Sequence, residues 1–270
     1  MDVIIKDDYQ AMGVYAAKCL AEVIKRKPNA VLGLATGTTP LATYNELIRM
    51  HREEGLDFSS VTTFNLDEYL GIGKNMDKSY LQDQSYARFM YESLFKHVNI
   101  DLNRTHVPDG LSQDPSAFCE EYEAKIKAAG GIDIQLLGIG GDGHWAFNEP
   151  GTSLSSRTHV EVLTQQTLDD NYELFYRKAG FSRDQMPHFA LTMGVGTILD
   201  ARALLMMASG SKKASVVAKA IEGPVTSQIT STAIQLYKGR AIVVLDEAAA
   251  SELKNKEHYL HVEKVKSQFV

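Results

Sequence analysis

The chain has 270 residues, 44% of them hydrophobic and 23% charged, which is typical of a soluble globular domain with a substantial core. Its formal net charge of −6 at pH 7 disfavours general binding to nucleic acid or membrane surfaces, because both need a basic face, yet it permits a local cationic pocket for a small anion. Cys19 and Cys119 fall in predicted helices, and the first residues lack a secretory signal pattern. We therefore expect a cytoplasmic protein with free thiols.

Helical windows and short apolar runs alternate along the chain, beginning with a helix around Tyr9 to Lys25. Strands are predicted at 30–35, 60–66, 132–139, 188–193, 202–209 and 240–245. No repeat, linker or membrane-length apolar run interrupts this order. The alternation predicts an α/β fold: one domain over residues 1–270, with an open, mostly parallel, Rossmann-like sheet and helices on both faces.

A turn rich in threonine and glycine follows the first of these strands and leads into a helix that runs through about Arg49. Its residues are Thr36, Gly37, Thr38 and Thr39. Glycine lets the main chain approach a ligand, threonine hydroxyls donate hydrogen bonds, and a helix amino terminus carries partial positive charge. The turn matches neither the Walker nor the dinucleotide motif, and an ordinary capped turn is the alternative. We predict a phosphate cradle.

Two adjacent acids, Asp67 and Glu68, end the predicted strand at 60–66. A carboxylate at the ligand-binding edge of an α/β sheet can act as a general base on a substrate C–H or O–H group. Glu68 would point another way and support it. Capping of a helix by Asp67 is the alternative interpretation.

An acid, an imidazole and a second acid follow the predicted strand at 132–139, within a run of glycines that builds tight turns. They are Asp142, His144 and Glu149. Histidine exchanges protons near neutral pH, and a flanking carboxylate fixes its tautomer and raises its basicity. A solvated, glycine-rich capping loop is the alternative. The spacing matches no common metal pattern, so we expect acid–base chemistry without a metal.

Two cations could complete a phosphate pocket. Lys213 follows the predicted strand at 202–209 and opens a helix, whereas Arg177 lies in a helical window and is the weaker candidate. Both residue types are more often solvated surface charges.

Together these segments resemble the glucosamine-6-phosphate deaminase family over nearly the whole chain. The resemblance rests on LGLATGTTP (32–40), FNLDEYLG (64–71), LGIGGDGHWAFNEPG (137–151), SRTH (156–159) and ALTMGVGTILDA (190–201). It implies conversion of D-glucosamine 6-phosphate and water into fructose 6-phosphate and ammonia, without a cofactor. It also implies that His144 opens the sugar ring, with Asp142 and Glu149 tuning it, and that Asp67 moves the proton from C2 to C1. The phosphate would be bound by the turn at 36–39 and by Lys213 and Arg177.

The chain departs from that family in two places. The family's phosphate arginine lies in an Asn-x-Arg-Phe-Phe sequence, whereas an acid, Glu173, stands here unless a short insertion brings Arg177 into place. Some members are hexamers activated by N-acetylglucosamine 6-phosphate through an arginine and a lysine, where this chain has His159 and Glu161. We therefore expect no such activation. A homo-oligomer is compatible with the resemblance, and the sequence leaves the number of subunits open.

Two other functions are weighed against deamination. A 6-phosphogluconolactonase has a similar fold, but lactone hydrolysis needs only one base and leaves the Asp67–Glu68 pair without a role. A sugar-phosphate sensor would add a DNA-reading helix pair and a basic face, and neither is evident.

A helical window with Tyr80 and Tyr86 is a candidate lid over the site.

Overall fold

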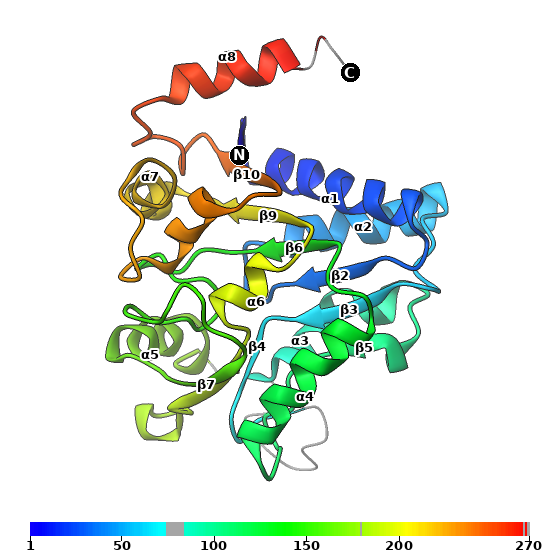
Figure 1. Cartoon of the computed structure of the whole chain (residues 1–270), viewed down its shortest axis with the longest axis vertical. Helices are drawn as coiled ribbons and strands as arrows, with labels where there is room; N and C mark the ends of the chain where they lie inside the picture. The colour runs from blue at the N-terminus through cyan, green and yellow to red at the C-terminus, as the bar shows by residue number, and fades with distance from the viewer. Residues whose placement is uncertain (74–83, 179, 267, 269–270) are drawn as a thin grey trace.

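The computed structural model describes residues 1–73, 84–178, 180–266 and 268 (Figure 1). In chain order the strands and helices are β1 (Asp2–Lys6), α1 (Tyr9–Arg26), β2 (Val31–Leu34), α2 (Leu41–Glu54), β3 (Thr62–Asn65), β4 (Asp67–Tyr69), α3 (Tyr86–Ser93), β5 (Thr105–His106), α4 (Pro115–Ala128), β6 (Ile134–Leu137), β7 (His159–Val162), α5 (Gln165–Asn171), β8 (Phe189–Thr192), α6 (Val195–Leu199), β9 (Ala203–Ala208), α7 (Ala214–Glu222), β10 (Arg240–Asp246) and α8 (Lys256–Lys266). A π-helical turn, Tyr172–Tyr176, continues α5. None of the described helices is long and apolar enough to cross a membrane.

Several helices begin where a short polar side chain caps the first turn. Asp8 accepts a hydrogen bond from the backbone of Ala11 at the start of α1, and Asp114 and Thr164 cap α4 and α5 in the same way. Such a side chain satisfies a backbone N–H group that has no partner within the helix. The local sequence therefore sets where these helices start.

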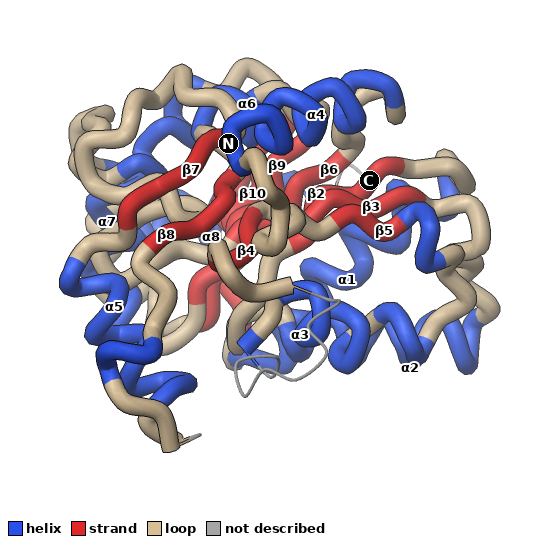
Figure 2. Tube along the Cα trace, turned by 90° about the horizontal axis from the view of Figure 1, so that it is seen from below, coloured by secondary structure: helices blue, strands red, loops and turns tan. Residues whose placement is uncertain are grey.

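The main sheet has seven strands in the order β1-β10-β9-β6-β2-β3-β5, and every adjacent pair is parallel. Its strands bury both faces, since Leu34 and Leu136 pack in one core cluster while Val31 and Leu137 pack in another. Residues of α1 and α2 complete the first cluster, and residues of α4, α6 and α7 complete the second. Figure 2 shows the sheet between these two helical layers. The predicted fold is thus confirmed.

A second, three-stranded antiparallel sheet, in the order β4-β8-β7, leans against the carboxyl ends of the main strands (Figure 2). The strand predicted at 188–193 forms here as β8 and not in the parallel sheet. Thr192 pairs with Asp67 on one side and with His159 on the other. The correction has a physical reason: a short apolar run has the same pattern in either sheet, and its pairing depends on distant partners.

The strand order reverses in the middle of the main sheet. From β2 the chain proceeds through β3 and β5 to one edge, and it then returns to place β6 on the other side of β2. Crossover connections on either side of such a point diverge and leave a crevice at the carboxyl ends of the strands. Because β6 pairs with both β2 and β9, the loops that leave these three strands are neighbours at that crevice.

Candidate active site

The loop that carries His144 is a compact turn held by its own backbone. The N–H group of Gly140 donates to the carbonyl of His144 at 2.9 Å, and that of Gly143 donates to Gly140 at 3.2 Å. Gly143 has a φ of +95°, and a Cβ atom on Gly140 would lie 2.5 Å from Nε2 of the imidazole. Glycine is therefore required at both positions, at one for its backbone conformation and at the other for the close approach of the ring.

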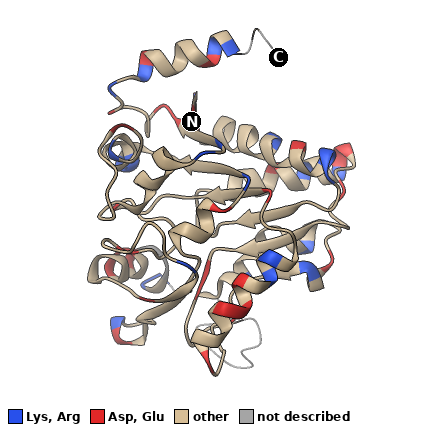
Figure 3. Cartoon of the chain, viewed as in Figure 1, with Lys and Arg blue, Asp and Glu red and all other residues tan. Residues whose placement is uncertain are grey.

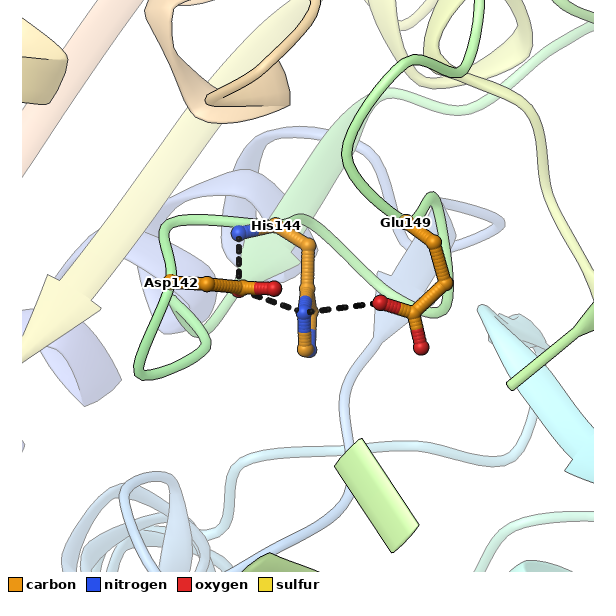
Figure 4. A group of neighbouring side chains, drawn as sticks. All are labelled: Asp142, His144 and Glu149. Carbon is orange, nitrogen blue, oxygen red and sulfur yellow. Dashed lines mark hydrogen bonds and ion pairs between the residues drawn. The ribbon is translucent and has the colours of Figure 1, made fainter. Parts of the chain in front are cut away.

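Asp142, His144 and Glu149 meet in this loop (Figure 4). Nδ1 of His144 lies 2.7 Å from Oδ1 of Asp142 and 3.9 Å from Oε2 of Glu149. The contact with Asp142 has the distance of an ion pair. Burial favours a higher pKa for Asp142, and the contacts with His144 outweigh it, so this pKa lies below its ordinary value. The acid is thus charged beside the ring at neutral pH.

The segment between His144 and Glu149 is strained and tightly packed. Ala146 has a φ of 52°, which side-chain-bearing residues rarely adopt. The fully buried Trp145 donates from Nε1 to Sδ of Met206, and Asn148 donates from Nδ2 to the carbonyls of Trp145 and Met193. These contacts offset the strain and fix the direction of the loop.

Thr164, at the start of α5, holds the carboxylate of Glu149. Its N–H group donates to Oε1 and its hydroxyl donates to Oε2, both at 3.1 Å, and Glu149 is only 3% exposed. These two hydrogen bonds fix the position of the buried carboxylate beside His144. The sequence analysis missed this residue. Its signal was the capping pattern of Thr164 with Thr167, which indicates a helix start but not a contact with Glu149.

Asp67 lies in β4, which begins just past the carboxyl end of β3, and is 6% exposed. Burial, and then the neighbouring charge of Glu68, raise the pKa of Asp67 to about 8. A buried carboxyl with a pKa in this range can accept and return a proton near neutral pH.

Glu68, the neighbour of Asp67, points to the start of α3. Its carboxylate accepts hydrogen bonds from the N–H groups of Tyr86 and Ala87 and from the hydroxyl of Ser85, so it caps α3. Burial raises the pKa of Glu68 to about 7, against the opposing effect of these hydrogen bonds. At this helix start, capping thus belongs to Glu68 and Ser85 and not to Asp67. Tyr86 begins α3, whereas Tyr80 lies outside the described residues.

The turn at 36–39 leaves β2 and leads into α2, whose first turn has no side-chain cap. Gly37 has a φ of +95° with open space where a Cβ would stand, and Thr38 is exposed. Tyr9 fixes the turn from below by donating to the carbonyl of Thr38 at 2.7 Å. Exposed hydroxyls beside an uncapped helix start can receive an anion.

Lys213 reaches the His144 loop from the 3-10 turn that follows the neighbouring strand, β9. Its Nζ donates to the carbonyl of Ile139 at 2.8 Å. Burial lowers the pKa of Lys213, with a smaller opposing effect from Asp170 and Asp142. Its ammonium group therefore lies beside the His144 loop, where it could pair with an anion.

The cluster of Asp142, His144 and Glu149 also has the dimensions of a cation site, since one ligand atom from each lies within 4.8 Å of the others. These three residues already contact one another and Thr164: Asp142 contacts both the ring and the backbone N–H group of His144, and Glu149 accepts a hydrogen bond from the hydroxyl of Thr164. The arrangement suits acid–base chemistry at His144, and it is the place where a metal ion would bind if the protein used one.

The glucosamine-6-phosphate isomerase/6-phosphogluconolactonase family matches residues 6–243 of the chain. The chain belongs to this family. Relatives include the glucosamine-6-phosphate deaminases of Shewanella loihica, 46% identical over 97% of this chain and 94% of the relative, and of Clostridium perfringens, 46% identical over 94% and 100%. A solved structure of a monomeric glucosamine-6-phosphate deaminase has a TM-score of 0.86 and 42% identity, covering 93% of this chain and 100% of that one. The 6-phosphogluconolactonase of Trypanosoma brucei, with a TM-score of 0.72 and 19% identity over 93% and 98%, shares the fold.

This family member differs from the expected pattern in the segment after α5. Arg177 is exposed and pairs with Glu173 at 2.8 Å, so the structure does not bring it to the crevice beside Lys213. Its role in phosphate binding stays a prediction.

His159 and Glu161 form a closed group. Nε2 of His159 and the hydroxyl of Thr152 both contact Oε2 of Glu161, at 3.1 Å and 3.0 Å.

Proposed function

We propose that the protein converts D-glucosamine 6-phosphate and water into D-fructose 6-phosphate and ammonia. The observation that carries this proposal is the presence of two separate proton-transfer groups at one edge of the sheet. The His144 cluster leaves β6, and the buried Asp67 lies in β4, beyond β3. Isomerisation of an amino sugar needs one group at the ring oxygen and another at carbon. Lactone hydrolysis needs only one, so deamination accounts for more of the site.

The phosphate would bind across the turn at 36–39 and Lys213, with Arg177 as a further candidate that would have to leave Glu173. Binding a distant dianion orients the sugar over the reacting groups, and this binding energy lowers the barrier of the later steps. His144 would then protonate the ring oxygen and help to remove the proton of the O1 hydroxyl, which opens the ring. Asp142 and Glu149, which lie beside Nδ1, would orient the ring for these transfers.

Asp67 would act on the open chain. Its carboxylate takes the proton from C2, the C2–H electron pair forms the C1–C2 double bond, and the aldehyde oxygen is protonated to give an enolamine. The proton returns from Asp67 to C1 while the nitrogen lone pair forms an iminium at C2. Water adds to that carbon and ammonia leaves, which gives the ketone. The balance consumes one water for each C–N bond broken, so the enzyme acts both as an isomerase and as a hydrolase of an amino sugar phosphate.

A substrate panel tests this assignment against the alternatives. Purified protein is given glucosamine 6-phosphate, galactosamine 6-phosphate and 6-phosphogluconolactone, with ammonia and acid release followed in parallel. We expect ammonia from an amino sugar phosphate and no acceleration of lactone hydrolysis. Lactone turnover without ammonia would favour the lactonase, and tight binding of duplex DNA without turnover would favour the sensor.

A further inference from the structure

Helix α5 is fixed at both ends by contacts with residues of the candidate site. At its start, Thr164 binds the carboxylate of Glu149. At its end, Nδ2 of Asn171 donates to the hydroxyl of Tyr69 at 2.9 Å, two residues from Asp67 along β4. The side chains of this helix therefore have defined positions relative to the site.

One of these side chains, Asp170, lies against the His144 loop. Its Oδ2 is 3.4 Å from the place where a Cβ atom of Gly141 would stand. Gly141 follows β6, which lies between β9 and β2 in the sheet, so its loop separates Lys213 from the turn at 36–39. Asp170 thus presents a carboxylate over the middle of the surface that would bind the phosphate. Figure 3 shows acidic residues on α5.

The neighbouring acid, Asp169, has a different environment. It pairs with Arg183 and accepts a hydrogen bond from Nε2 of Gln165 at 3.1 Å. Asp170 has no ion-pair partner within the part of the chain that the structure describes, and the cation whose charge it affects is Lys213. The negative charge of Asp169 is therefore compensated on the surface, whereas that of Asp170 acts on the cradle.

We propose that Asp170 is a specificity-determining residue that opposes binding of phosphate dianions at the Lys213 cradle. The inference rests on the proposed function for the identity of the substrate, but not for the presence of an anion site. A carboxylate beside a cationic site competes with an incoming anion and repels it. The residue thereby keeps affinity for the sugar phosphate low and favours release of the phosphorylated product.

The test compares Asp170→Asn with Asp169→Asn, which removes the same charge one residue away. Inorganic phosphate is the probe, as an inhibitor of turnover and as a ligand that raises the unfolding temperature. We expect Asp170→Asn to lower the inhibition constant of phosphate and the KM of the sugar phosphate about threefold to tenfold. The difference between this variant and wild type in both constants should become smaller at high salt. Asp169→Asn should leave both constants unchanged.

The direction of the effect separates this role from a structural one, because damage to α5 would weaken binding. Unchanged or weaker phosphate binding in Asp170→Asn, or equal tightening in Asp169→Asn, would overturn the inference. If the wild-type protein released no ammonia, the phosphate-dependent unfolding shift would still decide it. The proposed reaction would then fail while the anion-site inference stood or fell on its own.

Discussion

Nδ1 of His144 lies 2.7 Å from Oδ1 of Asp142, and the same oxygen accepts a hydrogen bond from the backbone N–H group of His144 at 3.1 Å. One carboxylate oxygen therefore fixes both the ring and the backbone of the histidine. The contacts also hold the pKa of Asp142 below its ordinary value against the effect of burial. Asp142 is therefore the residue best placed to orient the imidazole.

Replacing Asp142 by asparagine removes that charge and keeps an oxygen for the backbone of His144. We expect kcat/KM for glucosamine 6-phosphate to fall about 100- to 10,000-fold, the range for loss of effective acid–base catalysis. Steady-state kinetics measures the loss, and an unchanged unfolding midpoint shows that the loop is intact. Activity within twofold of wild type would contradict the assigned role.

Asp67 predicts a pH dependence of stability. Burial and the charge of Glu68 raise its pKa from 3.8 to about 8 in the folded protein. The folded state therefore binds this proton more tightly than the unfolded state, so its stability falls as pH rises through that interval. Glu68, whose pKa burial raises to about 7, acts in the same direction.

Asp67→Asn should thus gain stability relative to wild type at pH 8 but not at pH 3.5. Urea unfolding at several pH values measures the difference. Parallel stability curves for the two proteins would show that Asp67 is not a buried, proton-binding group.

Lys213 and Lys212 form a matched pair for testing the proposed phosphate site, because Lys212 is exposed and Lys213 is half-buried against Ile139. Lys213→Ala should raise KM about 10- to 100-fold, as expected for a charge-assisted hydrogen bond. Lys212→Ala should have little effect. Equal effects in the two variants would indicate only a general loss of positive charge.

The acid–base account also predicts insensitivity to chelators. Ligand atoms of Asp142, His144 and Glu149 lie close enough to hold a cation, yet the proposed steps use them to move protons. Dialysis against EDTA should leave kcat and KM unchanged. Loss of turnover that returns on adding Zn²⁺ or another divalent ion would replace the proton-transfer account with a metal-dependent one.

His159 and Glu161 lead to a prediction about regulation. Glu161 accepts from both His159 and Thr152, so the group presents an acid where an activating sugar phosphate would need cations. N-acetylglucosamine 6-phosphate should not raise turnover at subsaturating substrate. A several-fold activation would show that these residues rearrange or that the activator binds elsewhere.

The sequence predicted the parts of the fold that depend on local pattern. The apolar run at 132–139 became β6, and the acids and histidine that follow it meet because only a few residues of tight turn separate them. Three-residue β4 was not predicted, because its two acids become strand only by pairing with β8.

Long-range contacts account for the remaining differences in the site. Thr164 binds Glu149 across 15 positions, and Asn171 reaches Tyr69 across 102. Residue type cannot indicate such partners until the path of α5 is known. The position of the family's phosphate arginine has the same difficulty. It falls on Glu173 without an insertion and on Arg177 with one, and these two residues pair with each other in the structure.

The most direct test of the central claim measures ammonia and fructose 6-phosphate released from glucosamine 6-phosphate by wild-type protein, Asp67→Asn and His144→Gln. The account predicts equal amounts of both products from wild type and a collapse of turnover in each variant, with all three proteins folded. A folded wild type that releases neither product, or an Asp67→Asn variant that retains full turnover, would contradict it.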